Sequence, residues 1–315
     1  MKKAYSGMRH LALAGFVILS TVASGAAQTI LRMDNASCIG GLDNLAKVAK
    51  VDITPATTPR KVVGKCDAQS VQVVAQQAGV TLDIKRIKWN TNGLSPLADG
   101  KLPEQLRLEL RGVKVLEAPA GDPAWAYLVD YSRSGRTFDA GLAFVFDPDA
   151  GVLDLTGASI SFRNGNTAKL SGRLHGVVQG FPKNPEMGVF PLIIDDLTLA
   201  VSNGDARKNP LTELGITVLK KNIPNGDIAK FRALATLYIA NELSKVLDRN
   251  GLAASQRLVS DLPNPKGDLL LRLMANKGYP VLRFGLLRTG SKLSQMLDGV
   301  SVEFAYGPDL FATVN

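Results

Sequence analysis

The chain has few of the residues on which most catalytic and metal sites depend. Its 315 residues include two histidines, His10 and His175, and two cysteines, Cys38 and Cys66. A Ser-His-Asp site beyond residue 27 could use only His175, and no G-x-S-x-G turn frames a serine. One such histidine and two paired cysteines make no zinc set, and no phosphate-binding glycine loop is found. We therefore expect no catalytic residue, no cofactor and no metal site, so a protein that is not an enzyme.

Long apolar runs are confined to the start of the chain. Lys2, Lys3 and Arg9 precede or flank the apolar segment 11–23, and small residues follow at 23–27. This combination is typical of a cleaved secretory signal peptide, with an uncleaved membrane anchor as the alternative. Because the apolar segment is short for a membrane span, we expect residues 1–27 to be a signal peptide. The mature chain is then expected to be a soluble protein of a bacterial periplasm.

The two cysteines agree with export. An isolated pair in an oxidising compartment indicates a disulfide bond, here between Cys38 and Cys66. Such a bond would close a loop of about thirty residues and stabilise the fold by about 3–4 kcal/mol in the chain-entropy model. Two buried free thiols are the alternative. A redox pair is not favoured, because reactive dithiols usually have C-x-x-C spacing.

Positive charge is in excess, but it is spread along the chain. The net charge is +9, and removal of residues 1–27, which hold three cations and no acid, leaves +6. The densest run is Lys85-Arg86-Ile87-Lys88-Trp89, and aromatic residues make up only 6% of the chain. Nucleic-acid binding needs clustered cations with stacking aromatics, so no nucleic-acid partner is expected. A solvated basic surface, or peripheral contact with anionic lipid headgroups or acidic envelope polymers, fits this pattern.

Alternation of apolar and polar residues predicts a mainly β fold. In the stretch 70–90 the alternation changes phase at Lys85-Arg86, as it does at a β-bulge. Asp195-Asp196 is interpreted as another phase shift, since adjacent strand residues point to opposite faces and cannot share one site. The expected strands are 70–90, 106–111, 138–146, 152–162, 168–178, 190–202, 267–275, 281–287 and 300–306.

Helical spacing and turn residues complete the predicted architecture. We expect short helices at 38–50 and 291–297, and one long helix at 226–249 that ends at Asn250-Gly251. The long helix carries an apolar stripe with Leu234, Leu237 and Tyr238, which is expected to pack on the sheet; a partner-binding face is the alternative. Residues 147–151 predict a plain turn rather than a calcium loop, and Asn164-Gly165 predicts a hairpin.

The predicted fold is therefore a curved antiparallel meander with one long packed helix and a small disulfide-tied N-terminal region. The turn-rich segment 118–123 predicts a boundary between an N-terminal region, 28–118, and a meander domain, 124–315.

One strand carries the candidate ligand-binding residues. Phe138, Leu142, Phe144 and Phe146 lie on one face of the strand 138–146. If the helix 226–249 covers this face, the rings belong to a closed core. If the face is open, it forms a groove for the apolar chain of a ligand. Closure is the more usual environment for phenylalanine in an alternating strand.

Three alternating segments give a family resemblance. Leu153-Asp154-Leu155-Thr156, Leu170-Ser171-Gly172-Arg173-Leu174 and the segment 193–199 resemble parts of AsmA-like envelope proteins, over roughly residues 137–202 and 267–306. The resemblance implies a long curved sheet with an apolar concave face and a role in moving or organising lipids between membranes. Those proteins are usually much longer and keep an N-terminal membrane anchor, which this chain is expected to lose.

The expected function combines these observations. It is that of a soluble periplasmic binding or carrier protein for a lipid-like amphiphile in cell-envelope maintenance. The alternative is a structural or adaptor component of an envelope or secretion assembly, with a protein partner.

Overall fold

The computed structural model describes residues 36–163, 165–179, 191–203, 227–262, 264–281 and 297–308, together with the single positions 210, 213, 217, 283, 310 and 311. The expected signal peptide at 1–27, all but the last residue of the expected helix at 291–297 and most of the expected strand at 281–287 lie outside these residues, as does Asn164. No helix among the described residues is long and apolar enough to cross a membrane.

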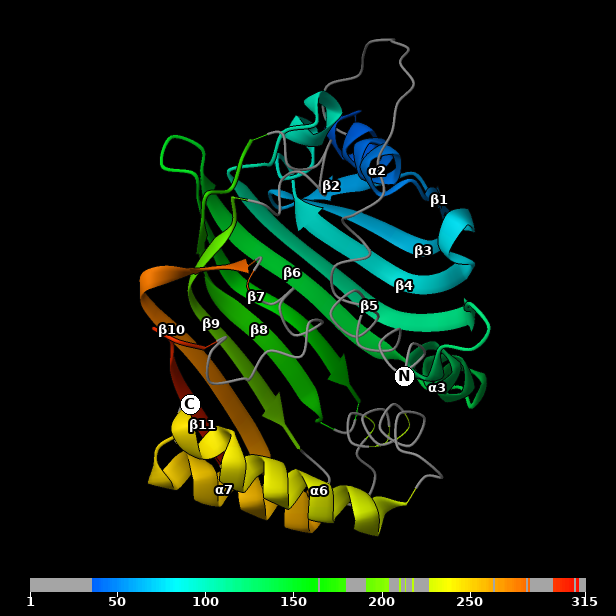
Figure 1. Cartoon of the computed structure of the whole chain (residues 1–315). Helices are drawn as coiled ribbons and strands as arrows, with labels where there is room; N and C mark the ends of the chain where they lie inside the picture. The colour runs from blue at the N-terminus through cyan, green and yellow to red at the C-terminus, as the bar shows by residue number, and fades with distance from the viewer. Residues whose placement is uncertain are drawn as a thin grey trace. The chain divides into compact units, whose positions relative to one another are not determined.

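Within the described residues, the alternating segments pair into an open, antiparallel sheet of eleven strands, which confirms the mainly β fold. From β3 onward, neighbours in the sheet are also neighbours in the sequence, while β1 and β2 both pair with β3 (Figure 1). This order is that of the expected meander, in which short turns join some successive strands, such as β6 and β7, and longer segments with helices join others, such as β9 and β10. The strands are β1 (Asp52–Pro55), β2 (Arg60–Val62), β3 (Lys65–Ala75), β4 (Val80–Asn90), β5 (Gln105–Glu117), β6 (Phe138–Asp147), β7 (Val152–Phe162), β8 (Thr167–His175), β9 (Ile193–Ser202), β10 (Asp268–Pro280) and β11 (Ser301–Gly307).

The chain divides into two compact units. Of the described residues, the first contains 36–160 and 177–179, and the second contains 161–176 and those from 191 onward. The segment 118–123, where the sequence predicts a boundary, lies inside the first unit. It leads from β5 into the helix α3 (Pro123–Arg133), which begins because Asp122 caps it: one carboxylate oxygen accepts the N–H groups of Ala124 and Trp125 at 2.9 and 3.2 Å.

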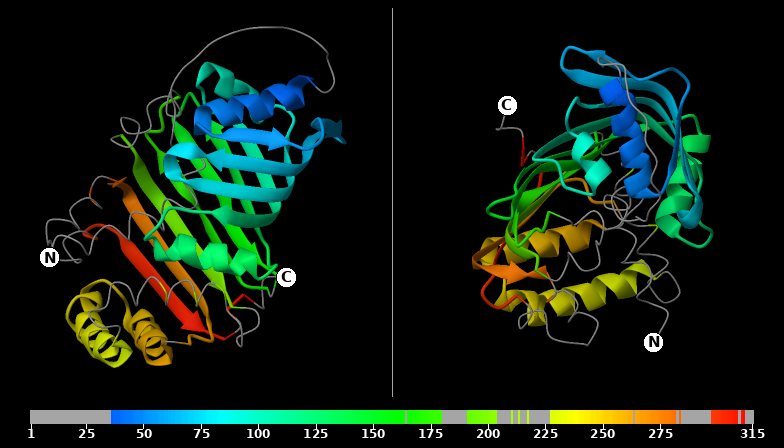
Figure 2. Two further views of the ribbon diagram at one scale, coloured as in Figure 1. Left: turned by 90° about the vertical axis from the view of Figure 1, so that its right-hand side faces the viewer. Right: turned by 90° about the horizontal axis from the view of Figure 1, so that it is seen from above.

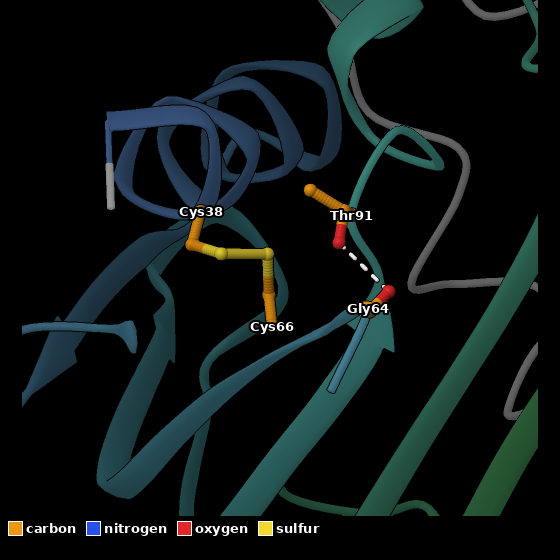
Figure 3. The surroundings of a disulfide bond; sticks show 4 residues. All are labelled: Cys38, Gly64, Cys66 and Thr91. Carbon is orange, nitrogen blue, oxygen red and sulfur yellow. Dashed lines mark hydrogen bonds between the residues drawn. A yellow bond between two sulfur atoms is a disulfide. The ribbon is translucent and has the colours of Figure 1, made fainter. Parts of the chain in front are cut away.

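In the first unit a disulfide bond joins the helix α2 (Ala36–Ala49) to β3 (Figure 3). Cys38 and Cys66 have Cα atoms 5.4 Å apart and are fully buried, which confirms the expected bond and the expected helix at 38–50. Trp89 lies opposite Cys66 in β4, and its side chain is also buried. Gly41 allows α2 to come close to this ring, since a Cβ atom there would lie 3.2 Å from Nε1 of Trp89.

Three adjacent strands of this unit change side-chain phase at the same level. In β4 the buried residues are Ile87 and Trp89 on one side of Lys85, and Ile84 on the other, which is the phase change that the sequence predicts. The pairing places Ser70 in β3 and Gly112 in β5 level with Lys85, and both have positive φ, 49° and 65°. Because each strand takes the extra residue at this level, the pairing registers of β4 do not shift there. The expected bulge therefore extends across three adjacent strands, each of which has one extra residue at the same level.

In the described segment 227–262 the second unit forms two helices where the sequence predicts one long helix. The helix α6 (Ile228–Asn241) ends before the 3₁₀ turn Leu243–Lys245, and α7 (Arg249–Asp261) follows. Asp248 accepts a hydrogen bond from the N–H of Gly251 at 2.7 Å, so it caps a new helix. Asn250-Gly251, expected to stop a helix, therefore lies in the first turn of α7.

The apolar stripe of α6 does not pack on the sheet as expected. Leu234, Leu237 and Tyr238 are 57%, 60% and 49% exposed, and the buried residue of α6 is Ile239. The reason is the second helix: α7 packs against β11, and α6 packs against α7 (Figure 2). The stripe is left on the solvent side of α6.

Candidate functional site: an apolar face of the sheet

The four strands of the second unit, β8 to β11, carry an apolar lattice on one face. Residues directly opposite each other in an antiparallel pair lie on the same face, so the registers of these strands identify its members. We call this surface the leucine face. Its three cross-strand rows are Ala168, Val201, Leu269 and Tyr306; Leu170, Leu199, Leu271 and Phe304; and Gly172, Leu197, Leu273 and Val302.

The leucine face is not closed like an ordinary core. Tyr306 is buried at 4% exposure, but all the other members are only half-buried. The opposite face of the same strands is mostly polar, with Lys169, Arg173, Arg272 and Glu303 exposed. With a strand spacing of about 4.8 Å, the leucine face extends about 14 Å across the four strands. A contiguous, partly uncovered apolar surface of this kind is where ligands and partners bind.

One end of the leucine face closes over a small core. Ile194, Ala275 and Tyr279 are buried together, and Leu174 and Leu197 pack against them. The strands are irregular here. Asp195 is an extra residue between the pairs that β9 makes with β8, and β10 gains residues between Met274 and Tyr279. The phase shift that the sequence predicts at Asp195-Asp196 is confirmed, and its effect is to turn Ile194 into this core.

The edge of the leucine face is fixed by one buried hydroxyl. Tyr306 in β11 donates a hydrogen bond from its hydroxyl to the carboxylate of Asp261 at the end of α7, at 2.7 Å. The same oxygen accepts the N–H groups of Lys266 and Gly267 at 2.9 and 3.2 Å. Burial is the main cause that raises the pKa of Tyr306, and the hydrogen bond to Asp261 adds to it. The hydroxyl therefore stays protonated and ties α7 to the sheet edge.

The four candidate residues of β6 lie in a closed environment. Phe138, Phe144 and Phe146 are 7%, 4% and 2% exposed, and Leu142 is half-buried. They face the buried leucines of β5, with Phe144 opposite Leu106. Leu237 of α6, which is expected to be buried on the sheet, is 60% exposed. The burial of the β6 residues fits the closed-core alternative rather than an open groove.

The polar residues that could carry chemistry have structural partners. His175 lies 2.9 Å from Asp195, Nδ1 to Oδ1, on partly exposed strand positions. Asp147 accepts the N–H groups of Asp149 and Ala150, both at 3.0 Å, which is the plain turn expected at 147–151. Among the described residues, no group of three or more His, Cys, Asp or Glu side chains could hold a metal ion.

The sequence contains part of the signal for the leucine face. Leu170, Leu174, Leu197 and Leu199 belong to the alternating segments that carry the family resemblance, and Leu269, Leu271 and Leu273 also occupy every second position, although Leu270 lies among them. What the sequence does not give is the register that aligns these leucines into rows. Comparison of the chain with protein-family models, curated proteins and solved structures finds no match.

Proposed function

We propose that the protein binds and carries a lipid-like amphiphile, whose apolar chain lies on the leucine face. The observation that supports this most is that four paired strands present leucines in register on one face, yet leave them half-buried. Burying a CH₂ group of a ligand gains about 0.8 kcal/mol, so an acyl chain of about sixteen carbons gains about 13 kcal/mol, which reaches micromolar affinity after a cost of binding of about 5 kcal/mol. The opposite face of these strands is mostly polar, so it can remain solvated while the leucine face binds the ligand.

A substitution in the middle of the leucine face tests the proposal. Leu199 has Leu170 and Leu271 on either side, so Leu199→Gln places a polar group where the chain would lie. Thr198→Gln is the matched control, because Thr198 is the next residue of β9 and points to the other face. We expect Leu199→Gln to weaken uptake of a fluorescent fatty acid by tenfold or more, and Thr198→Gln to leave uptake within twofold of the parent protein. Thermal melting of both variants checks that they are folded. Equal uptake by all three proteins would contradict the proposal.

An adaptor function is the second candidate, and the exposed stripe of α6 favours it. Leu234, Leu237 and Tyr238 are spaced for one side of a helix and are about half exposed or more. A partner that presents its own apolar helix face could cover them. Leu237→Glu should then abolish a stoichiometric complex, whereas Thr236→Glu, at an exposed position on the opposite side of α6, should preserve it.

Native mass spectrometry of protein from the cell envelope separates the two candidates. A bound amphiphile that is lost in Leu199→Gln supports the carrier. A protein partner lost only in Leu237→Glu supports the adaptor.

A further inference from the structure

The first unit has a basic surface on the face of the sheet opposite α2. We call it the basic face, and it spans β2 to β5. Cys66 points toward α2, so the residues before and after it in β3 point away from α2. Lys65 and the residues that pair with this outer side in β2, β4 and β5 therefore lie on the outer face. The members of the basic face are Arg60, Lys65, Arg86, Lys88, Arg107 and Arg111.

Two carboxylates lie among these six cations, and each is surrounded by positive charge. Glu109 lies 3.3 Å from Arg107, 3.2 Å from Arg111 and 4.0 Å from Lys65. Asp67 is 4% exposed and accepts two hydrogen bonds from Arg86. Six cations against two acids leave this cluster with a net charge of +4.

Two arginines of the basic face lie directly opposite each other on neighbouring strands, so their charges repel. Arg86 lies opposite Arg111 across β4 and β5, and like charges in this position are unfavourable. Asp67 and Glu109 offset part of the conflict. Arg107 and Arg111 nevertheless stay 66% and 57% exposed, and Lys65 stays 48% exposed. Their guanidinium and ammonium groups remain open to an external anion.

The shape of the basic face favours an extended anionic surface over a small ligand. Its depression, lined by Lys65, Lys88, Asn90, Arg107 and Glu109, has a volume of about 20 Å³, enough for a water molecule. The one aromatic residue of the lining, Trp89, is buried toward α2, so bases have nothing to stack on. One arginine side chain can donate two parallel hydrogen bonds to the oxygens of a phosphate group. Clusters of four to eight cations bind anionic membranes.

From these observations we infer that the basic face docks the protein on a bilayer containing anionic phospholipid. The inference concerns a surface of the first unit and does not depend on the leucine face carrying a ligand. It agrees with such a role, however, since a carrier of lipids must meet a membrane to load or unload.

The test is co-sedimentation with vesicles of phosphatidylcholine, with and without phosphatidylglycerol. We expect binding only to the anionic vesicles, with affinity falling as salt is added. Each cation near such a surface contributes about fivefold, so Arg107→Gln with Arg111→Gln should weaken binding roughly 25-fold. The matched control is Arg173→Gln with Arg272→Gln, which removes the same charge from exposed positions in the second unit and should change binding less than threefold.

Three results would overturn the inference: no binding to anionic vesicles at low salt, equal loss in both double variants, or binding to an acidic polysaccharide with none to vesicles. Uptake of fluorescent fatty acid by the Arg107→Gln, Arg111→Gln variant should stay unchanged. Failure of the docking surface and failure of the carrier proposal are therefore distinguishable.

Discussion

The hydroxyl of Tyr306 and the carboxylate of Asp261 form a hydrogen bond of 2.7 Å that joins the last strand of the sheet to the end of α7. The two residues are 45 positions apart in the sequence. Because the same hydroxyl also accepts two backbone N–H groups, one oxygen atom satisfies three polar groups at the edge of the leucine face.

Tyr306→Phe should therefore destabilise the protein without leaving a large cavity. The ring stays, but the buried N–H of Gly267 loses its acceptor, and we expect unfolding in urea to require about 1–3 kcal/mol less free energy. Tyr238→Phe is the control, because Tyr238 is 49% exposed; it should change stability by less than about 0.5 kcal/mol. Similar losses in both variants would show that the hydroxyl network of Tyr306 contributes little.

Asp67 predicts a dependence of stability on acid pH. The hydrogen bonds from Arg86 are the main cause that lowers the pKa of Asp67 below its usual value of 3.8. A lowered pKa in the folded state stabilises the protein fully above pH 3.8, and this contribution is lost as pH falls through the lower folded value. Asp67→Asn should cost about 1–3 kcal/mol at neutral pH, and the gap from the parent protein should shrink below pH 3.8.

Urea unfolding at neutral pH and below pH 3.8 measures that gap. Asp130→Asn is the control, since its ion pair with Arg133 joins side chains that are 74% and 73% exposed and should be worth little. A gap for Asp67→Asn that stays constant with pH would contradict the assignment.

Alanine substitutions at Gly112 and Gly64 distinguish the cost of backbone strain from the cost of a steric clash. Both have positive φ, 65° and 71°, which costs alanine about 1–2 kcal/mol. A Cβ atom at Gly112 would also lie 2.9 Å from Cβ of Lys85, whereas one at Gly64 would meet nothing within 4 Å. Gly112→Ala should therefore lower the free energy of unfolding by about 2–4 kcal/mol, and Gly64→Ala by about 1–2 kcal/mol. Equal losses of stability in the two variants would mean that β4 moves away from the new Cβ atom at no energetic cost.

Phe144 tests whether the candidate residues of β6 are core or groove. Phe144 is 4% exposed, so Phe144→Ala should cost about 3–5 kcal/mol. Val145 is next to it, points to the other face and is 45% exposed, so Val145→Ala should cost less than about 1 kcal/mol. Uptake of fluorescent fatty acid per folded molecule should be unchanged in both. If Phe144→Ala kept the melting temperature of the parent protein but lost uptake, the binding site would have to be assigned to β6 instead.

The sequence predicts the local features of this fold better than the arrangements that join them. Alternation locates β5 through Leu106, Leu108 and Leu110, because a strand with one buried face needs period two. The spacing of Cys38 and Cys66 could not say which elements the bond connects, but their number indicated the bond. The sequence predicts one unbroken helix over 226–249, because the apolar spacing continues to Leu247, but α6 ends at Asn241 and the cap at Asp248 starts a new helix.

The site shows the same limit. Phe138, Phe144 and Phe146 stand out because three large rings share one strand, yet crowding of this kind is also what a closed core requires. The leucine face is composed of ordinary alternating leucines, such as Leu199 and Leu271. Its character arises when the register aligns them and when the surrounding chain leaves them half-buried. Neither property can be read from residues taken one strand at a time.

The row formed by Ser70, Lys85 and Gly112 restricts how the chain length can change during evolution. Deleting Lys85 alone would turn Ile84 and Val80 from the buried face of β4 to the outer face. The same deletion is tolerable only if β3 and β5 each lose their own extra residue, because the three strands then return together to simple alternation. Loss or gain of a residue at this level is therefore a concerted event in three segments of the gene, and single-residue indels here should be eliminated by selection.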